Sequence, residues 1–393
     1  LAPRFGAGGG DLRRGLFVAK LFYFFYFAAI GCLTPFLNVY FARLGLTGAQ
    51  IGWLSSVAPL IALTANPFWG AVSDRWQVHR WVLALCAFGA GLISLLYLAV
   101  DSFWPLMAVV VALSFFRTPI GSLVDSAVID LVRRVGSSYG HQRMWGSLGF
   151  VLVTLVLGRL IGADDLQIAF WLHGLLLAVV CTGLGLRLPI AGQDGRISLL
   201  AGLRRLAAQR SYMTFLGAMA LLGMGTSSYV NFLGLHMLEL GGSEAMIGLA
   251  WAVNGMAEFP MMLFGGHWFA RVPHGRLIQF GFAGYALVWV LMALVTEPLA
   301  LVVCSALNGV CYGTVWVAAV TYAGESAPPG LSATAQALIG AAQSGIGWSL
   351  GSVMAGYLWD LQGGMAVFGM AVVAALSGGL LLWLGERGAP REA

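Results

Sequence analysis

Four charged residues stand inside otherwise apolar segments, where a hydrophobic helix would bury them: Arg117, Asp125, Arg143 and Glu258. A charge at the centre of a membrane helix costs about 2.5 to 3.5 kcal/mol, so such residues are rare and usually functional. Carboxyl groups can bind and release protons, whereas arginine stays protonated. Asp125 and Glu258 are therefore candidate proton carriers. Arg117 and Arg143 are candidate partners for an acid, a carbonyl dipole or an anionic substrate.

Glu258 lies near the middle of the apolar segment 245–270. That is roughly 20 Å along a helix that rises about 1.5 Å per residue. Burial in an apolar medium favours the neutral form of a carboxyl group, which would let Glu258 exchange a proton near neutral pH. The alternative is a structural acid hydrogen-bonded to Asn254 or to another helix.

Arg117 lies equally deep in its segment, and Asp125 follows it on roughly the same helix face. Arg117 and Asp125 could form an internal pair, or Arg117 could hold a substrate carboxylate. The charges of Arg117, Arg143, Asp125 and Glu258 cancel when both acids are ionised. That balance suits a neutral substrate carried with a proton, or a monoanion held by arginine.

Neutral polar residues inside the apolar segments could bind substrate hydroxyl groups, although each alone more often joins two helices. They are Asn38, Asn66, Asn231, Asn254, Asn308 and Gln343. Tyr26 could stack on a substrate. We expect His173 and His236 to have local partners rather than a transport role.

The composition predicts an all-α membrane protein. Hydrophobic residues make up 59% of the 393 residues and charged residues 9%, against about 25% charged in a soluble domain. Each crossing takes about 20 apolar residues. We expect twelve transmembrane helices at 16–41, 49–72, 80–100, 104–132, 140–162, 167–187, 212–238, 245–270, 276–296, 298–323, 334–358 and 364–385.

The distribution of lysine and arginine predicts the orientation. These residues concentrate in alternate loops, and only Arg43 and Arg159 fall in the opposite set. Since basic loops stay inside, both termini should be cytoplasmic and the protein should lie in the inner (cytoplasmic) membrane. The expected order is a cytoplasmic tail (1–15), a six-helix bundle (16–187), a cytoplasmic linker (188–211), a second six-helix bundle (212–385) and a cytoplasmic tail (386–393).

The two halves repeat. RLGLTGAQIG at 43–52 matches ELGGSEAMIG at 239–248, an offset of 196 residues. At the same offset Ala62 takes the place of Glu258, so the fold itself does not need an acid there. Parallel repeats of this length are typical of transporters built from two pseudo-symmetric six-helix bundles.

GAVSDRWQVHR at 70–80 resembles the loop signature between helices 2 and 3 of the major facilitator superfamily, with Asp74, Arg75 and Arg80 at its charged positions. The resemblance implies the major facilitator fold. We expect gate salt bridges at the cytoplasmic helix ends, Asp74 with Arg75 and Asp130 with Arg133. We also expect Asp74 to lie near the start of helix 11.

A narrower resemblance is to the branch with lactose permease and the 3-phenylpropionate and nucleoside proton symporters. It is carried by LVDSAVIDLV, YGHQRMWGSLGF and GMAEFPMMLF. It implies that Asp125 and Arg143 pair, and that Asp125, Arg143 and Glu258 belong to the substrate and proton machinery. Helix 10 departs from lactose permease, because it reads LNGVCYG, with Asn308 and Cys311.

These observations favour proton-coupled symport of a small organic solute (sugar, nucleoside or aromatic acid) by alternating access. The alternatives are proton-antiport efflux, and a non-transporting subunit or assembly factor of a membrane complex. No HExxH, GxSxG, Cys/His cluster or nucleic-acid motif occurs in the sequence, so we expect no enzyme, cofactor, metal or nucleic acid. The expected partners are the substrate, protons and lipid, around a monomer for which association with a complex stays open.

Overall fold

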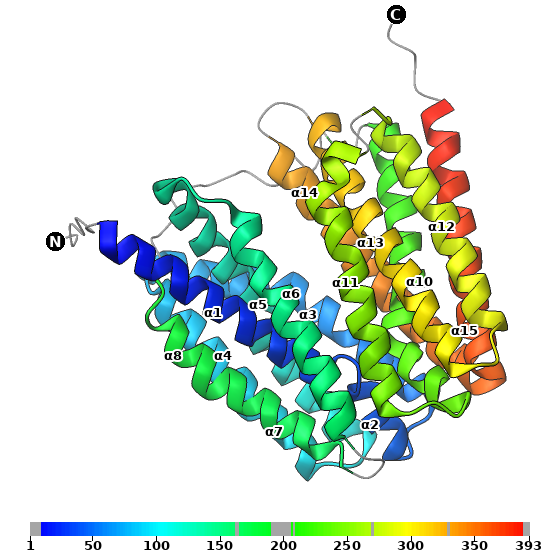
Figure 1. Ribbon diagram of the computed structural model, residues 1–393, viewed down its shortest axis with the longest axis horizontal. Coiled ribbons are helices and arrows are strands. Elements are labelled where there is room, and N and C mark those ends of the chain that lie inside the picture. The colour runs from blue at the N-terminus through cyan, green and yellow to red at the C-terminus, as the bar shows by residue number, and fades with distance from the viewer. Residues whose placement is uncertain are drawn as a thin grey trace, which may run out of the picture. The chain divides into compact units, whose positions relative to one another are not determined.

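The computed structural model describes residues 9–161, 165–189, 206, 209–268, 271–327 and 331–387. Every regular element within these residues is helical (Figure 1). The predicted linker and the two predicted tails lie largely outside the described residues.

The described residues of the first half of the chain form ten helical segments. They are α1 (Gly9–Leu33), α2 (Leu37–Arg43), α3 (Gly48–Trp76), α4 (His79–Leu95), η1 (Leu96–Ala99), α5 (Phe103–Val135), α6 (Tyr139–Leu160), α7 (Gln167–Leu175), η2 (Leu176–Cys181) and α8 (Thr182–Gly185). Helix α1 begins at Gly9 rather than near residue 16, where the sequence analysis placed the first span.

The second half contains seven helical segments within the described ranges. They are α10 (Arg210–Glu239), α11 (Glu244–Trp268), α12 (His274–Leu294), α13 (Pro298–Ser326), α14 (Ser332–Gly340), η3 (Ala341–Gly347) and α15 (Trp348–Arg387). Segments η2 and η3 are π-helical turns, which frequently occur at functional sites.

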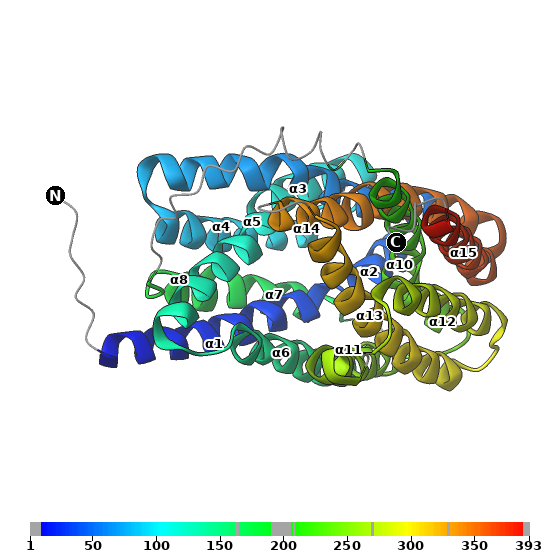
Figure 2. The ribbon, with the colours of Figure 1, turned by 90° about the horizontal axis from the view of Figure 1, so that it is seen from above.

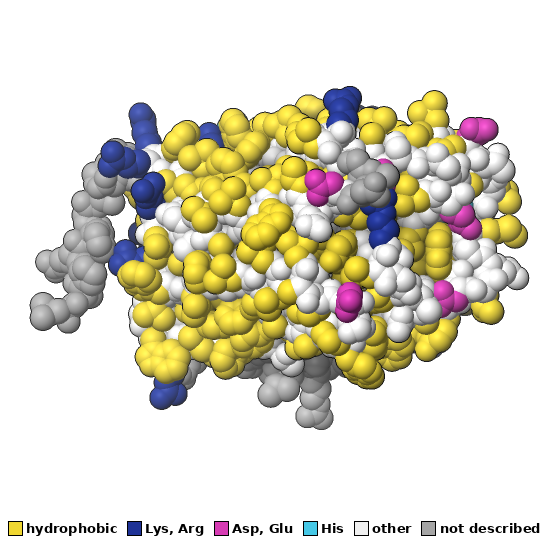
Figure 3. Space-filling model, turned by 90° about the horizontal axis from the view of Figure 1, so that it is seen from below, with side chains coloured by type: hydrophobic (Ala, Val, Ile, Leu, Met, Phe, Trp, Pro, Cys, Tyr) yellow, Lys and Arg dark blue, Asp and Glu magenta, His cyan; other side chains and the backbone are white. Residues whose placement is uncertain are grey.

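Eleven of the helical stretches within the described residues are long and apolar enough to cross a bilayer. Hydrophobic side chains cover most of the face drawn in Figure 3, and charged side chains occur there at scattered places. The last stretch, Thr334–Gly385, is interrupted in α15, where Gln362 and Gly363 have non-helical backbone angles.

In both repeated segments, the helix that precedes the repeat ends in a similar way. Gly45 has φ +83° and Gly241 has φ +80°, and these two residues are equivalent at the offset of 196. Both glycines end a helix in the left-handed conformation that other residues rarely adopt. In the first turn of α3, Thr47 and Gln50 form a reciprocal capping box, with Gln50 N–H donating to Thr47 Oγ1 at 3.2 Å and Thr47 N–H to Gln50 Oε1 at 3.0 Å.

Pro119 interrupts the hydrogen-bond ladder of α5 close to Arg117. Proline has no N–H, so the carbonyl of Phe115 loses its partner four residues on. Trp69 Nε1–H donates to that carbonyl at 3.0 Å. A neighbouring helix thus satisfies the freed carbonyl, as the hydrocarbon environment requires, and α3 is fastened to α5 near Arg117.

Glycines let particular helix pairs approach closely. A Cβ at Gly149 of α6 would overlap the Phe24 carbonyl of α1, and one at Gly309 of α13 would overlap the Asn254 carbonyl of α11. Further along the chain, Gly347 of η3 and Gly351 of α15 meet the backbone of α10, but nothing lies within 4 Å of a Cβ built at Gly340 of α14. Small residues at such crossings provide the dense packing that holds membrane helices together.

The contacts divide the chain into two compact units. Unit 1 takes the described residues within Leu1–Thr34, Ile61–Leu157 and Asp164–Asp194, and unit 2 takes those within Pro35–Leu60, Gly158–Ala163 and Gly195–Ala393. In unit 1, α4 packs against α5 and α7. In unit 2, α12 packs against α13 and α15 (Figure 2). Residues 35–60, assigned from the sequence to the first bundle, thus have their contacts in unit 2, and the predicted bundle boundaries stay a prediction.

Candidate functional site

Asp125 of α5 is the centre of a polar cluster inside unit 1. The Tyr23 hydroxyl of α1 donates a hydrogen bond of 2.6 Å to Asp125 Oδ1, and Tyr23 is only 1% exposed. Tyr139, at the start of α6, also interacts with the Asp125 carboxylate, and its ring meets that of Tyr23 edge-on at 6.5 Å between centroids. Hydrogen bonds to a charged acceptor are short and strong, so the phenols hold Asp125 in a defined orientation.

Arg143 of α6 stacks on aromatic rings beside this cluster. Its guanidinium carbon lies 3.7 Å from the Phe27 centroid and 5.7 Å from the Tyr23 centroid, distances at which the ring face attracts a cation. Gly146 leaves room for this stacking, because a Cβ at that position would lie 2.7 Å from the Phe27 ring and 3.0 Å from Arg143 Nη1.

The direct Asp125–Arg143 pair implied by the resemblance is therefore corrected. Among the described residues these two side chains form no ion pair. Tyr23 serves both charges instead, since its hydroxyl donates to the carboxylate and its ring meets the guanidinium. The sequence resemblance brought the right residues together but missed the aromatic side chain between them.

Arg117 faces the interior of unit 1. It is half-buried, and its charge acts on Tyr26, Tyr97 and His173. It makes no ion pair with Asp125 within the described part of the chain. Tyr26 is buried, and the space beside Gly121 faces its hydroxyl. Arg117 and Tyr26 therefore remain candidates for substrate contact.

The sequence analysis missed Lys20 as a site residue, although Lys20 lies within the predicted first span (16–41). The structure places Lys20 well inside α1, with Nζ 5.8 Å from the Trp145 centroid. Lys20, Tyr23 and Phe27 are three and four residues apart and share one helix face. That spacing was a usable signal for a cationic and aromatic face on α1.

Unit 2 contains a chain of neutral polar side chains across three helices. Trp289 Nε1–H of α12 donates to Asn308 Oδ1 of α13 at 3.2 Å. Asn308 Nδ2–H then donates to Asn254 Oδ1 of α11 at 3.0 Å. Asn308 is buried and Asn254 half-buried, so Asn254 is the more accessible end of this hydrogen-bonded series.

Glu258 follows Asn254 by one turn of α11 and is half-buried. Its charge acts on the hydroxyl groups of Tyr229 in α10 and Tyr285 in α12. A Cβ at Gly313 would lie 2.9 Å from the Glu258 carbonyl, so α13 packs tightly behind this turn. Glu258 is therefore held among helices of unit 2.

Gln343 of η3 borders a narrow crevice lined also by Leu222, Tyr285, Tyr312, Val315 and Trp316. Gln343 is 5% exposed, and its Oε1 has no partner among the described residues. The rings of Tyr312 and Trp316 lie nearly parallel, 6.1 Å apart with 10° between their planes. The crevice has no room for a water molecule in this conformation, so a solute would reach the Gln343 acceptor and the aromatic faces only after the surrounding helices move.

Asn231 is committed to helix packing. It is 8% exposed, its Nδ2–H donates to Ser352 Oγ at 2.8 Å, and its carbonyl accepts from Asn38 Nδ2–H at 2.9 Å. Its bonds thus fit the alternative role of joining helices, which the sequence analysis had left open.

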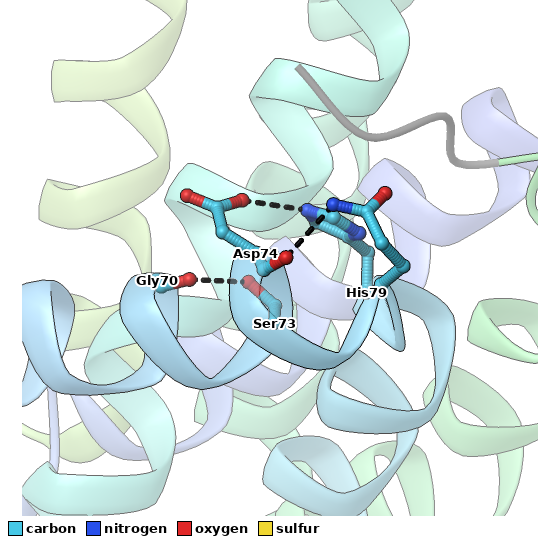
Figure 4. Close-up of polar contacts among 5 residues, drawn as sticks. Gly70, Ser73, Asp74 and His79 are labelled. Carbon is cyan, nitrogen blue, oxygen red and sulfur yellow. Dashed lines mark hydrogen bonds and ion pairs between the residues drawn. The ribbon is translucent and has the colours of Figure 1, made fainter. Parts of the chain in front are cut away.

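The loop between α3 and α4 holds Asp74 differently from the expected pairing with Arg75. His79 Nε2 lies 2.9 Å from Asp74 Oδ1, and Gln77, with φ +52°, donates from Nε2–H to the Asp74 carbonyl at 2.8 Å (Figure 4). Asp74 thus bonds across the turn to His79 rather than to the adjacent Arg75. Arg75 and Arg80 lie instead over the rings of Trp76 and Trp81.

The second expected gate pair is also corrected. Asp130 forms its ion pair with Arg134, at 2.7 Å, rather than with Arg133. Arg134 is four residues on, which places it on the same face of α5. Both partners are partly exposed, so the pair adds little stability.

The chain matches the model of the MFS_1 like family over residues 16–370. It belongs to this family, within the major facilitator superfamily. Maltose permease of Geobacillus stearothermophilus is 31% identical over 98% of each chain. The probable 3-phenylpropionic acid transporter of Escherichia coli K12 is 27% identical, over 90% of this chain and 93% of the relative.

Among solved structures, the nucleoside transporter NupG (D323A mutant) superposes with a TM-score of 0.83. The alignment covers 95% of this chain and 99% of NupG at 18% identity. This likeness shows the fold. The chain is therefore an integral membrane transporter of the major facilitator type that moves a small molecule. The predicted superfamily and branch resemblance are confirmed.

Proposed function

We propose that this transporter carries a small organic solute together with protons, by alternating access. The observation that carries the proposal is that each unit holds a carboxyl group among polar and aromatic side chains within its helices. Asp125 is bonded by Tyr23, and Glu258 acts on Tyr229 and Tyr285. Ionisable groups inside membrane helices mark substrate pathways and proton relays.

The proton is assigned to Glu258. A coupling group must be protonated on one side of the membrane and release its proton on the other, which arginine cannot do. Asp125 is fastened by phenols beside a stacked arginine, an arrangement that suits positioning. Glu258 follows Asn254 on the face that a solute can reach, so solute and proton can influence each other there.

A sugar is the substrate class that the lining of unit 2 supports best. Asn254 and Gln343 offer hydrogen-bonding groups, and the stacked rings of Tyr312 and Trp316 offer an apolar face. Sugars combine hydroxyl groups with apolar ring faces, and the relative at 31% identity is named a maltose permease. Nucleosides and aromatic acids are the next candidates.

The proposed topology has twelve spans in two six-helix bundles, with both termini in the cytoplasm. Thr334–Gly385 is 52 residues long, more than twice the roughly 20 residues of one crossing, and it is broken at Gln362 and Gly363. We assign it to two spans. The bias of lysine and arginine supports the orientation in an inner membrane, and the protein is assigned as a monomer.

Uptake into proteoliposomes tests this function. Labelled maltose, a nucleoside and 3-phenylpropionate are offered with the outside acidic, and again after a protonophore has collapsed the gradient. We expect gradient-dependent accumulation of the sugar. Accumulation only when the inside is acidic would establish antiport instead, and absence of uptake for all three classes would remove the proposed substrates.

Arginine variants separate neutral from anionic substrates. Arg117→Gln and Arg143→Gln are compared with wild type on maltose and on 3-phenylpropionate. A selective loss of the acid would assign the arginines to a carboxylate. Equal losses of uptake for both substrates would indicate that the two arginines maintain the structure of unit 1.

A further inference from the structure

His236, in the last turn of α10, is bonded at both ring nitrogens. It is 4% exposed. Its Nε2 lies 3.1 Å from the carbonyl oxygen of Met292 in α12, and its Nδ1 lies 2.9 Å from Glu239 Oε2. Glu239 Oε2 also accepts the Gly364 N–H of α15 at 3.1 Å. We call His236, Glu239, Gly363 and Gly364 the α10–α15 clasp.

These bonds fix the number of protons in the clasp. A carbonyl oxygen can only accept, so Nε2 must carry a hydrogen. In a neutral imidazole Nδ1 would then present a lone pair to an ionised Glu239, which also only accepts. One more proton must lie between them, on Nδ1 or on the carboxyl group. The geometry therefore needs a proton beyond a neutral histidine and an ionised glutamate.

Two other histidines do not need such an additional proton. Buried His173 contacts only the Ala29 carbonyl, from Nδ1 at 2.7 Å, and its Nε2 has no partner among the described residues. A neutral imidazole satisfies that arrangement. His274 lies 3.0 Å from Glu325 Oε2, but both side chains are exposed enough for water to replace the bond.

The backbone around the clasp is shaped for it. A Cβ at Gly364 would overlap the His236 ring, and one at Gly363, where φ is +63°, would overlap the Glu239 carboxylate. Gly363 lies at the break of α15. Phe368 covers the ring of His236, with centroids 5.4 Å apart. The backbone at the break of α15 therefore packs directly against His236 and Glu239.

The neighbouring charged groups are engaged elsewhere. On α15, Asp360 accepts the N–H groups of Gly48 and Ala49 at 2.6 and 2.8 Å. Arg43 of α2 pairs with Glu244 of α11, and exposed Glu297 precedes α13. Within the described residues, Glu239 is the only charged side chain bonded to His236. The negative end of the α10 dipole further favours a proton there.

We propose that His236 and Glu239 form a proton-binding site that fastens the break of α15 to the end of α10 and releases it when the proton is lost. Glu239 is 44% exposed, so the proton can exchange with solvent. The clasp is closed at low pH and loosens as the pH rises. In the proposed topology, on which this placement rests, it faces the outer solution.

Hydrogen–deuterium exchange tests the site without a substrate. The exchange of a peptide covering residues 360–367 is measured in detergent between about pH 5 and pH 8, the range in which histidine changes charge. After correction for intrinsic exchange, protection of the Gly364 amide should fall about tenfold as the pH rises, the size of one charge-assisted hydrogen bond.

Three variants decide the origin of that change. His236→Phe keeps a ring beside Phe368 but cannot hold the proton, so protection should be low at every pH. Glu239→Gln keeps an oxygen that can accept from Gly364 but cannot titrate, so the pH dependence should disappear. His274→Gln should behave as wild type. A wild-type amide insensitive to pH, or an unchanged pH step in His236→Phe and Glu239→Gln, would overturn the proposal, whatever solute the protein carries.

Discussion

The polar interiors of the two units differ in kind. Unit 1 holds charges, with Asp125 bonded by a phenol and Arg143 and Lys20 placed against aromatic rings. Unit 2 holds mainly neutral amides linked in series, Asn308 and Asn254, with Glu258 one turn further on. The aromatic residues have different tasks accordingly. In unit 1 they compensate charge, while in unit 2 they line a crevice beside Gln343.

This difference suggests a division of labour. A positioned charge with fixed partners is suited to orienting a solute, because its geometry changes little. An acid one turn from Asn254 on α11 is suited to coupling, because a carboxyl group can bind and release a proton. The predictions below test this division, from the largest expected effect to the smallest.

Glu258→Gln should have the largest effect. The amide mimics the protonated carboxyl group, so accumulation driven by a pH gradient should be abolished while exchange of labelled for unlabelled solute continues. Both are measured in proteoliposomes. Gln343→Asn is the matched unit 2 variant, in which gradient-driven accumulation should persist at reduced affinity. Uphill transport by Glu258→Gln would end the assignment of the proton to this residue.

Asp125→Asn should weaken solute binding rather than coupling. It removes a charge-assisted hydrogen bond of about 1.5 to 3 kcal/mol, equivalent to roughly ten- to a hundredfold in affinity. Tyr23→Phe removes only the hydroxyl and should have a smaller effect in the same direction. The half-saturation concentration for exchange measures both. If neither variant shifts it, the charged cluster of unit 1 is not part of the binding site.

Asp74→Asn should weaken closure on the cytoplasmic side, with a few-fold change in the rate at which a cysteine introduced into the pathway is labelled from that side. The two pairs differ at their histidines: the His79 side chain is 11% exposed in the Asp74–His79 pair of unit 1, whereas that of His274 is 32% exposed in the His274–Glu325 pair of unit 2. Exposed pairs contribute little, so His274→Gln should leave labelling unchanged. Equal labelling of Asp74→Asn and wild type would contradict the gate assignment.

Gly149→Ala should destabilise the protein by about 1 to 3 kcal/mol, because the new methyl group would overlap the Phe24 carbonyl and force α1 from α6. Gly340→Ala in unit 2 is the control. Nothing lies within 4 Å of its Cβ, and alanine is favoured over glycine in a helix. Thermal unfolding in detergent compares the two. A Gly149→Ala protein as stable as Gly340→Ala would show that the α1–α6 contact is not tight.

Several features followed from local sequence. Apolar length predicted the helices, and the shared pattern at 43–52 and 239–248 appears in the structure as two glycines with nearly equal positive φ. Charged residues in apolar segments led to Arg117, Asp125, Arg143 and Glu258. Each of these signals is a local pattern or, for the repeat, a comparison of two local patterns, so no knowledge of packing was needed.

The partners of those residues could not be predicted in the same way. Tyr23 lies between Asp125 and Arg143, Asp130 bonds Arg134, and Asp74 bonds His79. Lys20, near the start of the predicted span 16–41, was counted with the basic residues that set the orientation rather than with the site residues. A side chain's partner depends on how helices rotate and how closely they pack, which glycines such as Gly146 control from a different helix.

The sequence by itself thus determined that the chain crosses a membrane many times, repeats, and carries ionisable groups where lipid would not tolerate them. Only the tertiary structure decided which of those groups meet. The clearest example is the contact of the α15 break with His236 and Glu239. The hydrogen bond from Gly364 to Glu239 joins residues 125 positions apart. No local sequence pattern encodes this geometry, from which the need for an additional proton follows.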